Sequence, residues 1–224
     1  MNITQLDEQQ YVRILSWRSM VITNLLCLWP VACIVASLAI IAILNGKAPW
    51  TVSQIALALI AMIAIVFATF RTLFNVGWEA NRYLERRAHD IISRRPDRVV
   101  DPMNPDRVFV EVVPRKNWNQ PKLEDAADVG FFRIDRGERR VLFEGGSERW
   151  IIRAADIISC HFEKFMASQF MPRFMIVLGI DKGDSSVVEK CFSPRYSSGI
   201  FGNRKRKERA QAIVRDIENM RTGG

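Results

Sequence analysis

The chain has 224 residues, of which 49% are apolar, and its 32 Lys and Arg residues outnumber its 24 Asp and Glu residues, giving a formal charge of +8. These averages hide two different parts. Residues 20–44 and 50–70 contain no charged residue, whereas the chain after residue 75 is rich in charge. This contrast excludes a chain that is disordered throughout, and it argues against a single soluble core.

The two uncharged runs are each long enough to cross a bilayer as a helix. At about 1.5 Å per residue, residues 20–44 cover about 37 Å and residues 50–70 about 31 Å, against a hydrocarbon core of about 30 Å. Their lack of alternation argues against barrel strands. Only residues 45–49 separate them, so they predict a transmembrane helical hairpin over residues 20–70. Pro30 predicts a kink in the first helix. The alternative, a helical hairpin buried in a soluble protein, would lack a solvated face.

Basic residues beside the two runs predict the orientation of the hairpin. Arg13 and Arg18 precede the first run, Lys47 lies in the turn, and Arg71 follows the second run, with Arg82, Arg86 and Arg87 soon after it. Because Lys and Arg accumulate on the cytoplasmic side, both termini are predicted to be cytoplasmic in a multi-pass protein of the cell (inner) membrane, with residues 1–19 as a cytoplasmic segment. The predicted membrane-interface residues are Trp17, Trp50, Trp78, Arg82, Arg86 and Arg87.

Residues 71–95 are predicted to continue the second helix as a cytoplasmic stalk. One apolar stripe has helical spacing: Leu73, Gly77, Ala80, Leu84, Ala88 and Ile91. The stripe either packs on the protein's own domain or joins the stalks of two copies, and the pattern leaves both open. Pro96 ends the helix, and the proline-rich residues 96–106 are expected to be a linker.

Beyond residue 106 the apolar period changes to two, which indicates strands. Seven strands are expected, at residues 108–113, 129–135, 138–144, 148–153, 158–165, 173–180 and 186–192. Short turns at 135–137 and 145–147 favour hairpins. An amphipathic helix is expected at about 203–221. Residues 107–224 are therefore predicted to form a small antiparallel barrel or sandwich capped by the terminal helix, which makes the whole chain an α+β membrane protein.

The stretch DVGFFRIDRGERRVLFEGGSERWIIRAADI, residues 128–157, resembles pleckstrin-homology-like (PH-like) domains, especially the bacterial and GRAM types. The outline is matched by Gly130, Leu142, Phe143, Ile152, Asp156 and Ile157, and the terminal helix fits as well. The resemblance covers roughly residues 107–221. It implies a seven-stranded barrel with a capping helix, but not one function, because such domains bind lipids, peptides or no known ligand.

No pattern in the sequence predicts catalysis. The two histidines, His89 and His161, lie far apart, and no nucleophile elbow, phosphate loop or zinc spacing occurs. The four cysteines lack metal-ligand spacing. We therefore expect no enzyme, no metal site, no cofactor and no small-molecule substrate.

Two basic clusters and two apolar loops supply the candidate binding residues. The first cluster is Arg133, Arg136, Arg139 and Arg140, on a predicted hairpin where the resemblance implies phosphate contacts in phosphoinositide-binding relatives. Asp135 and Glu138 dilute its charge, so a solvated hairpin is the alternative. The second cluster is Arg204, Lys205, Arg206, Lys207 and Arg209, which opposes the dipole of the last helix and suits an anionic partner, either a bilayer or an acidic protein. A merely solvated helix start is its alternative. The loops contribute Phe170 and Phe201.

These patterns predict a membrane-anchored scaffold or assembly subunit that acts through protein contacts, either with a partner or as a homo-oligomer. The alternative function is binding or sensing of anionic membrane lipids by the same domain. Nucleic acid is not expected as a partner, because from residue 76 onward 28 basic residues face 22 acidic ones and aromatic side chains are not interleaved with the basic run.

Overall fold

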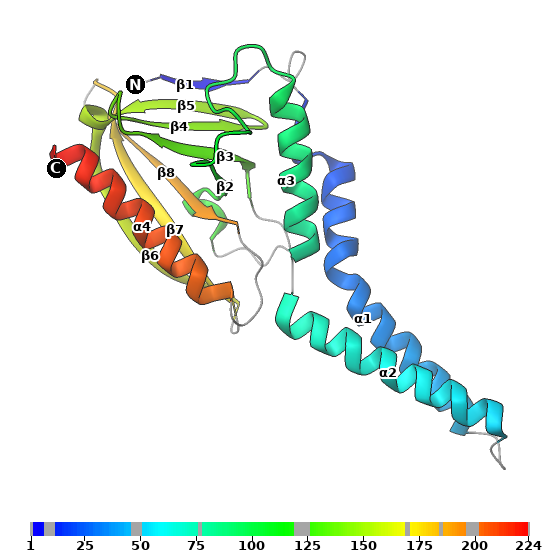
Figure 1. Cartoon of the computed structure of the whole chain (residues 1–224). Coiled ribbons are helices and arrows are strands. Elements are labelled where there is room, and N and C mark those ends of the chain that lie inside the picture. Colours follow the sequence, from blue (N-terminus) through cyan, green and yellow to red (C-terminus); the bar gives the residue numbers. More distant parts are fainter. Residues whose placement is uncertain are drawn as a thin grey trace.

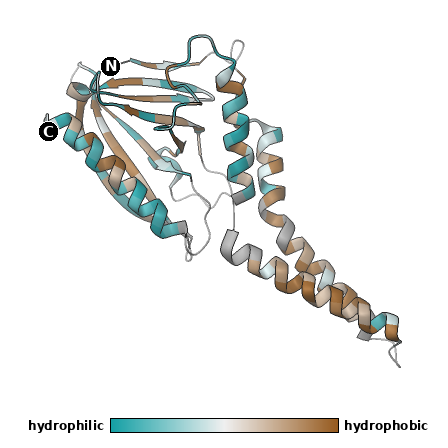
Figure 2. Cartoon of the chain, in the orientation of Figure 1, coloured by the Kyte–Doolittle hydropathy of each residue, from teal (hydrophilic) through white to brown (hydrophobic). Residues whose placement is uncertain are grey.

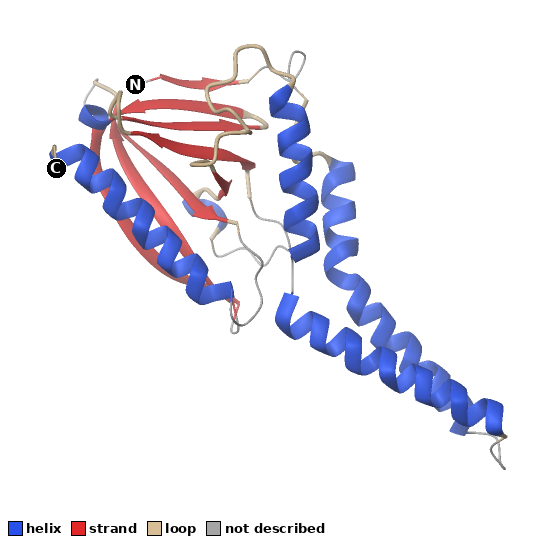
Figure 3. Cartoon of the chain, in the orientation of Figure 1, coloured by secondary structure: helices blue, strands red, loops and turns tan. Residues whose placement is uncertain are grey.

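The structure is a computed structural model of the chain, and it describes residues 2–6, 12–45, 51–75, 78–118, 126–168, 171–183, 186–195 and 202–223. One curled antiparallel sheet is covered by helices, and two apolar helices project from this body (Figure 1, Figure 3). The predicted α+β class is therefore confirmed.

The sheet has the strand order β1-β5-β4-β3-β2-β8-β7-β6, and every neighbouring pair is antiparallel. The strands are β1 (Asn2–Gln5), β2 (Val108–Val112), β3 (Asp128–Asp135), β4 (Arg140–Gly145), β5 (Glu148–Arg153), β6 (Ile157–Ser168), β7 (Met171–Asp181) and β8 (Val187–Pro194). Strands β2 to β8 are the seven predicted from alternation, and each boundary lies within three residues of its expected position.

Strand β1 is an addition that the sequence did not predict, because Asn2–Gln5 is short and contains a single apolar side chain. It pairs with β5, so that Asn2 lies opposite Ile151 and Gln5 opposite Glu148. The amide of Leu6 extends the pairing by donating to the carbonyl of Ser147 at 2.9 Å. The segment before the first apolar helix is therefore part of the sheet.

The sheet curls but does not close, since β1 and β6 are its two edges in the part of the chain that the structure describes. The expected barrel or sandwich is thus an open, curled sheet with eight strands among the described residues, one more than the seven predicted. The inner face is covered instead by helix α4 (Gly202–Thr222), which buries Ala210, Ile213, Ile217 and Met220. These side chains pack with Trp150, Phe192 and the other inward-facing residues of the strands, so an apolar helix face replaces the missing strand contacts.

The outer face of the sheet is covered by helix α3 (Trp78–Ser93). Leu84, Ala88 and Ile92 of α3 are fully buried in a cluster with Phe131 and Leu142. The predicted stripe on residues 80, 84 and 88 therefore packs on the protein's own sheet, which was one of its two interpretations. Farther along the same face, Trp118 covers β7 and β8 just after the short 3-10 helix η1 (Arg115–Asn117).

Helices α1 (Trp17–Asn45) and α2 (Val52–Asn75) form the projecting hairpin (Figure 2). Within the described residues, α2 alone is a straight helix apolar and long enough to cross a membrane, over Val52–Phe70, and 11% of that stretch is buried inside the protein. Helix α1 reaches this length only as a bent pair, Trp17–Leu26 and Val31–Ile43, with 48° between the parts. The break contains Pro30, whose missing amide hydrogen agrees with the expected kink.

The predicted continuous stalk is not a single helix. Helix α2 ends at Asn75, α3 begins at Trp78, and the two run in different directions (Figure 1). The first part of α1 lies beside α3. The residues that follow α3 also lie against the sheet, because Val100 is fully buried in the cluster of Leu84 and Phe131. Local periodicity could not reveal this turn, because the apolar spacing continues across residues 76–77.

Candidate functional site

A pocket of about 590 Å³ lies between the β3–β4 turn and α4. Three arginines that the sequence placed in two separate clusters line it together: Arg133 and Arg136 from the turn, and Arg209 from the helix. Asp106, Asp135 and Asp216 also line this depression, here called the hairpin pocket. The fold thus brings the two basic clusters to one place, but it surrounds them with carboxylates.

Ion pairs reduce the positive charge of the hairpin pocket. Arg136 lies 3.1 Å from Asp216, and Arg140 lies 3.0 Å from Asp135. Burial disfavours the charged form of Asp135, but the amide of Glu138 and the guanidinium of Arg140 outweigh it and hold the pKa of Asp135 below its ordinary value. The pocket is therefore a charge-balanced polar site rather than a strong anion trap.

Arg139, the remaining arginine of the predicted hairpin cluster, has a structural role. Its backbone adopts φ 48°, and its Nη2 donates to the carbonyl of Met220 at 2.8 Å. A cation that binds the last carbonyls of a helix satisfies acceptors that lack intrahelical partners and complements the helix dipole. Arg139 therefore fastens the end of α4 to the β3–β4 turn.

The basic residues at the start of α4 differ in their exposure to solvent. Lys205 and Lys207 are exposed, as is Arg204, which pairs with Glu208 at 2.8 Å. Arg206 is 9% exposed and lies on the buried stripe of the helix. The spacing 206, 210, 213, 217 could have revealed this, because it is the helical period of the inward face.

A buried carboxylate lies near Arg206. Burial opposes ionisation of Glu111, but Arg195, Arg173 and Arg206 together hold the pKa of this carboxyl below its ordinary value. Arg195 makes the closest contact, with its Nε 3.0 Å from Oε2 of Glu111. Sequence reasoning missed this group, since its members come from β2, β7, α4 and the residue just after β8 and share no local pattern.

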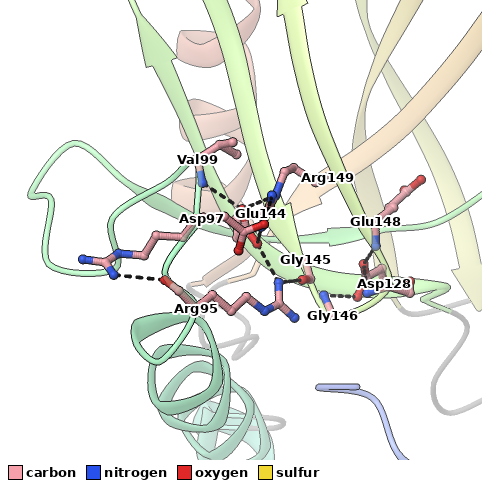
Figure 4. A network of polar contacts seen from close by, with 11 residues as sticks. Arg95, Asp97, Val99, Asp128, Glu144, Gly145, Gly146, Glu148 and Arg149 are labelled. Carbon is pink, nitrogen blue, oxygen red and sulfur yellow. Dashed lines mark hydrogen bonds and ion pairs between the residues drawn. The ribbon is translucent and has the colours of Figure 1, made fainter. Parts of the chain in front are cut away.

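A polar network joins the end of α3 to the sheet (Figure 4). Arg95 donates to Glu144 at 2.6 Å and to the carbonyl of Gly145 at 2.7 Å, while Arg149 donates to the other side of the Glu144 carboxylate at 2.8 Å. The amide of Val99 also donates to Glu144, at 2.9 Å. Glu144 is fully buried, so these donors replace the water that its charge would otherwise need.

Asp128 organises the neighbouring β4–β5 turn. Its carboxylate accepts the amides of Gly146 and Ser147 at 2.8 Å and that of Glu148 at 3.0 Å. Burial raises the pKa of Asp128, and the amide hydrogen bonds oppose that rise. Together with the Glu144 network, this carboxylate makes the corner between α3, β4 and β5 a rigid part of the molecule.

The exposed side of α3 borders a second depression of about 590 Å³, here called the α3 groove. Val12, Tyr83, Ile91 and Pro96 give it apolar walls, and Arg86, Arg87, Asp90, Arg94 and Arg95 complete its lining. Arg86 and Arg87, expected at the membrane interface, therefore belong to this groove. Arg82 is exposed on α3, and Trp17 is 76% exposed at the start of α1.

The remaining predicted binding and interface residues are aromatic. Phe170, Phe201 and Trp50 lie outside the described residues, as does the side chain of Trp78. No group of three or more His, Cys, Asp or Glu side chains suited to a metal ion occurs in the ranges that the structure covers. His161 pairs with Glu163 at 2.9 Å, and His89 lies 3.7 Å from Asp90.

The chain matches no family model, and no curated protein or solved structure is similar enough to count as a match.

Proposed function

We propose that this chain is a membrane-anchored scaffold or assembly subunit, which holds a PH-like domain at the cytoplasmic face of the inner membrane for contacts with proteins. The proposal rests above all on the α1–α2 hairpin. Its apolar side chains face outward, for example Ile60 at 63%, Ile63 at 67% and Val66 at 63% exposure. Such a surface needs lipid or another apolar surface to cover it.

The pairing of β1 with β5 supports a double crossing. Strand β1 precedes α1 in the chain, and its partner β5 follows α2. Hydrogen-bonded strands lie on the same side of a bilayer, so α1 and α2 cross as a pair or not at all. The basic residues beside the hairpin favour the cytoplasm as that common side.

The strand connections support the PH-like assignment. Strands β2 to β5 are neighbours in chain order, as are β6 to β8, and the first and last strands of this set pair with each other. The terminal helix α4 covers the inner face. This arrangement agrees with the seven strands and capping helix that the resemblance of residues 128–157 implies.

A rigid connection between anchor and domain favours a scaffold over a freely tethered reader. Strand β1 enters α1 through Ile14, which is fully buried beside Leu84 of α3, and α3 itself packs on the sheet. The guanidinium of Arg87 holds this junction, since its Nε donates to the carbonyl of Ile14 at 3.0 Å. A domain fixed in this way presents its surfaces at a defined height and orientation above the membrane.

The proposal is tested in two steps on the full chain. An impermeant maleimide added outside spheroplasts should label Lys47→Cys and should leave Lys205→Cys unlabelled, in a background without the four native cysteines. Native-size measurement after mild detergent extraction should then give a homo-oligomer or a stoichiometric partner. Labelling of Lys205→Cys from outside, or a strictly monomeric chain without any partner, contradicts the proposal.

Lipid binding by the domain is the second candidate, favoured by the position of the α4 start. The N-terminal end of α4 points toward the side of the hairpin, whereas its C-terminal end lies at the far side of the domain (Figure 1). Lys205 and Lys207 are exposed there. The full chain in phosphatidylglycerol nanodiscs should protect both lysines from acetylation more than in phosphatidylcholine nanodiscs, and salt should remove the difference. Equal acetylation in both lipids contradicts lipid binding.

A further inference from the structure

The α3 groove is lined by helix α3, which is packed on the sheet, and by two arginines, Arg86 and Arg94, that have no ion pair within the described residues. Helix α3 buries residues 80, 84, 88 and 92 against the protein, and its adjacent Tyr83 and Ile91 line the groove together with Arg94, one residue beyond the helix. The other walls are Val12 of the N-terminal segment and Pro96 beyond the helix. The α3 wall is packed on the sheet from its opposite side, whereas Val12 is 63% exposed.

The four arginines of the groove fall into two kinds. Arg87 and Arg95 are committed to the protein, to the carbonyl of Ile14 and to Glu144 respectively. Arg86 and Arg94 are exposed, and neither has an ion pair among the residues that the structure describes. Among the described residues of the lining, Asp90 is the one carboxylate. The groove thus has apolar walls, an excess of positive charge and two guanidinium groups available to a ligand.

We propose that the α3 groove binds an acidic, extended segment of a protein partner, in which one apolar side chain is flanked by two carboxylates. This assignment rests on the proposed scaffold function and names the chemistry of its partner. The apolar side chain would cover Tyr83 and Ile91, while the carboxylates pair with Arg86 and Arg94, whose planar guanidinium groups suit bidentate contacts.

The spacing of the arginines defines the segment. Arg94 directly follows the last residue of α3 and is eight positions beyond Arg86, which corresponds to about 12 Å along the helix axis. In an extended chain, residues i and i+4 are about 13 Å apart, and residues i, i+2 and i+4 point to the same side. The pattern Glu-x-Leu-x-Glu therefore places two carboxylates and one leucine opposite the two arginines and the apolar walls.

The location of the groove favours a protein over a lipid. Its residues belong mainly to the second half of α3, the end that points away from α2 and the membrane hairpin (Figure 1). Because α3 is already packed on the sheet in the free protein, binding requires little ordering of the α3 wall.

The test uses the full chain in phosphatidylcholine nanodiscs and a fluorescein-labelled peptide containing Glu-Ser-Leu-Ser-Glu, with fluorescence anisotropy as the readout. The wild-type chain should bind it, and Arg86→Glu with Arg94→Glu should weaken binding at least about tenfold. Lys164→Glu with Lys182→Glu is the matched control, with the same charge change at two other exposed positions, and should bind like the wild type. Peptides with Gln for Glu, or Ser for Leu, should bind weakly.

Several outcomes overturn the assignment: no binding at low salt, equal losses in both double variants, or unchanged binding of the Gln peptide. If short-chain phosphatidylglycerol competes through Arg86 and Arg94 while the peptide does not bind, the groove takes a lipid headgroup instead. If the chain is monomeric and has no partner but still binds the peptide, the scaffold function is contradicted and the peptide-binding role of the groove stands. If the peptide does not bind, and a partner still co-purifies with the Arg86→Glu, Arg94→Glu variant, the groove assignment is wrong while the scaffold function stands.

Discussion

Arg95, just beyond α3, lies with its Nη1 2.6 Å from Oε1 of Glu144 on β4, and both side chains are buried. This contact links the segment that follows α3 to strand β4 of the sheet. Arg149 and the amide of Val99 share the same carboxylate, so Glu144 is the point where the helix, the following segment and two strands meet.

Removal of the Glu144 carboxylate should therefore destabilise the domain strongly. Glu144→Ala removes the buried ion pair between Arg95 and Glu144, and the free energy of unfolding should fall by about 3–5 kcal/mol. Denaturant unfolding of the full chain in detergent, followed by tryptophan fluorescence, measures this change. Arg204→Ala breaks an exposed ion pair and serves as the control, with a midpoint expected to equal that of the wild type. Equal midpoints for the two variants would refute the role of Glu144.

Gly130 on β3 should not tolerate a side chain. A Cβ at this position would overlap the carbonyl oxygen of Glu144 and the backbone of Gly145 on the neighbouring strand. Gly130→Ala should lower the free energy of unfolding by about 1–3 kcal/mol, because strand backbone has to move. Gly137→Ala is the matched control, since its Cβ would meet only an oxygen of Asp135 at 3.7 Å. A Gly130→Ala protein as stable as Gly137→Ala would show that β3 and β4 are farther apart than in this structure.

The register of β1 against β5 can be tested by cross-linking. Asn2 lies directly opposite Ile151, and directly opposed residues in an antiparallel pair have Cα atoms about 4.5–5.5 Å apart, within disulfide range. Mild oxidation should join Asn2→Cys to Ile151→Cys within one chain, detected as a mobility shift on a non-reducing gel. Asn2→Cys with Arg149→Cys, two residues out of register, should cross-link far less. The reverse preference would require a different pairing of the N-terminal strand.

Acid should weaken the outer face of the sheet at Arg115. Its guanidinium donates hydrogen bonds to Glu163 and Glu189, at 2.7 and 2.8 Å, and these bonds hold the pKa of both carboxyls below their ordinary value. Because the folded-state pKa is lowered, the stabilisation is complete above the unfolded glutamate pKa of about 4.3 and is lost as pH falls through the folded value.

Arg115→Ala should therefore lower the unfolding midpoint at pH 7 and flatten its decline between about pH 5 and pH 3. All three side chains are partly exposed, so the effect at pH 7 should be about 1 kcal/mol or less. Lys182→Ala, at an exposed position near the end of β7, should keep the wild-type pH profile. If the unfolding midpoint of Arg115→Ala declines with falling pH as steeply as that of the wild type, other carboxylates cause the decline.

The strands and the terminal helix were predictable because their apolar residues follow one period between clear turns. Strand β1 was not, since Asn2–Gln5 gains its stability from pairing with Glu148–Ile151, about two thirds of the chain away. The hairpin pocket was predictable in part. The sequence shows its arginines as two clusters, but the fold is needed to bring Arg209 near Arg133 and to pair Arg136 with Asp216. The α3 groove was hidden because Tyr83 and Ile91 are unremarkable until Val12 lies opposite them.

The pairing of Thr4 with Arg149 also has a consequence for biosynthesis. These partners are 145 residues apart, so at about 5–20 residues per second the first strand waits on the order of 10 s for the second to be translated. During that interval both apolar helices have left the ribosome, while Asn2–Gln5 still has no partner. The edge strand is therefore added late, and a nascent chain arrested before residue 148 must leave its N-terminal segment unpaired.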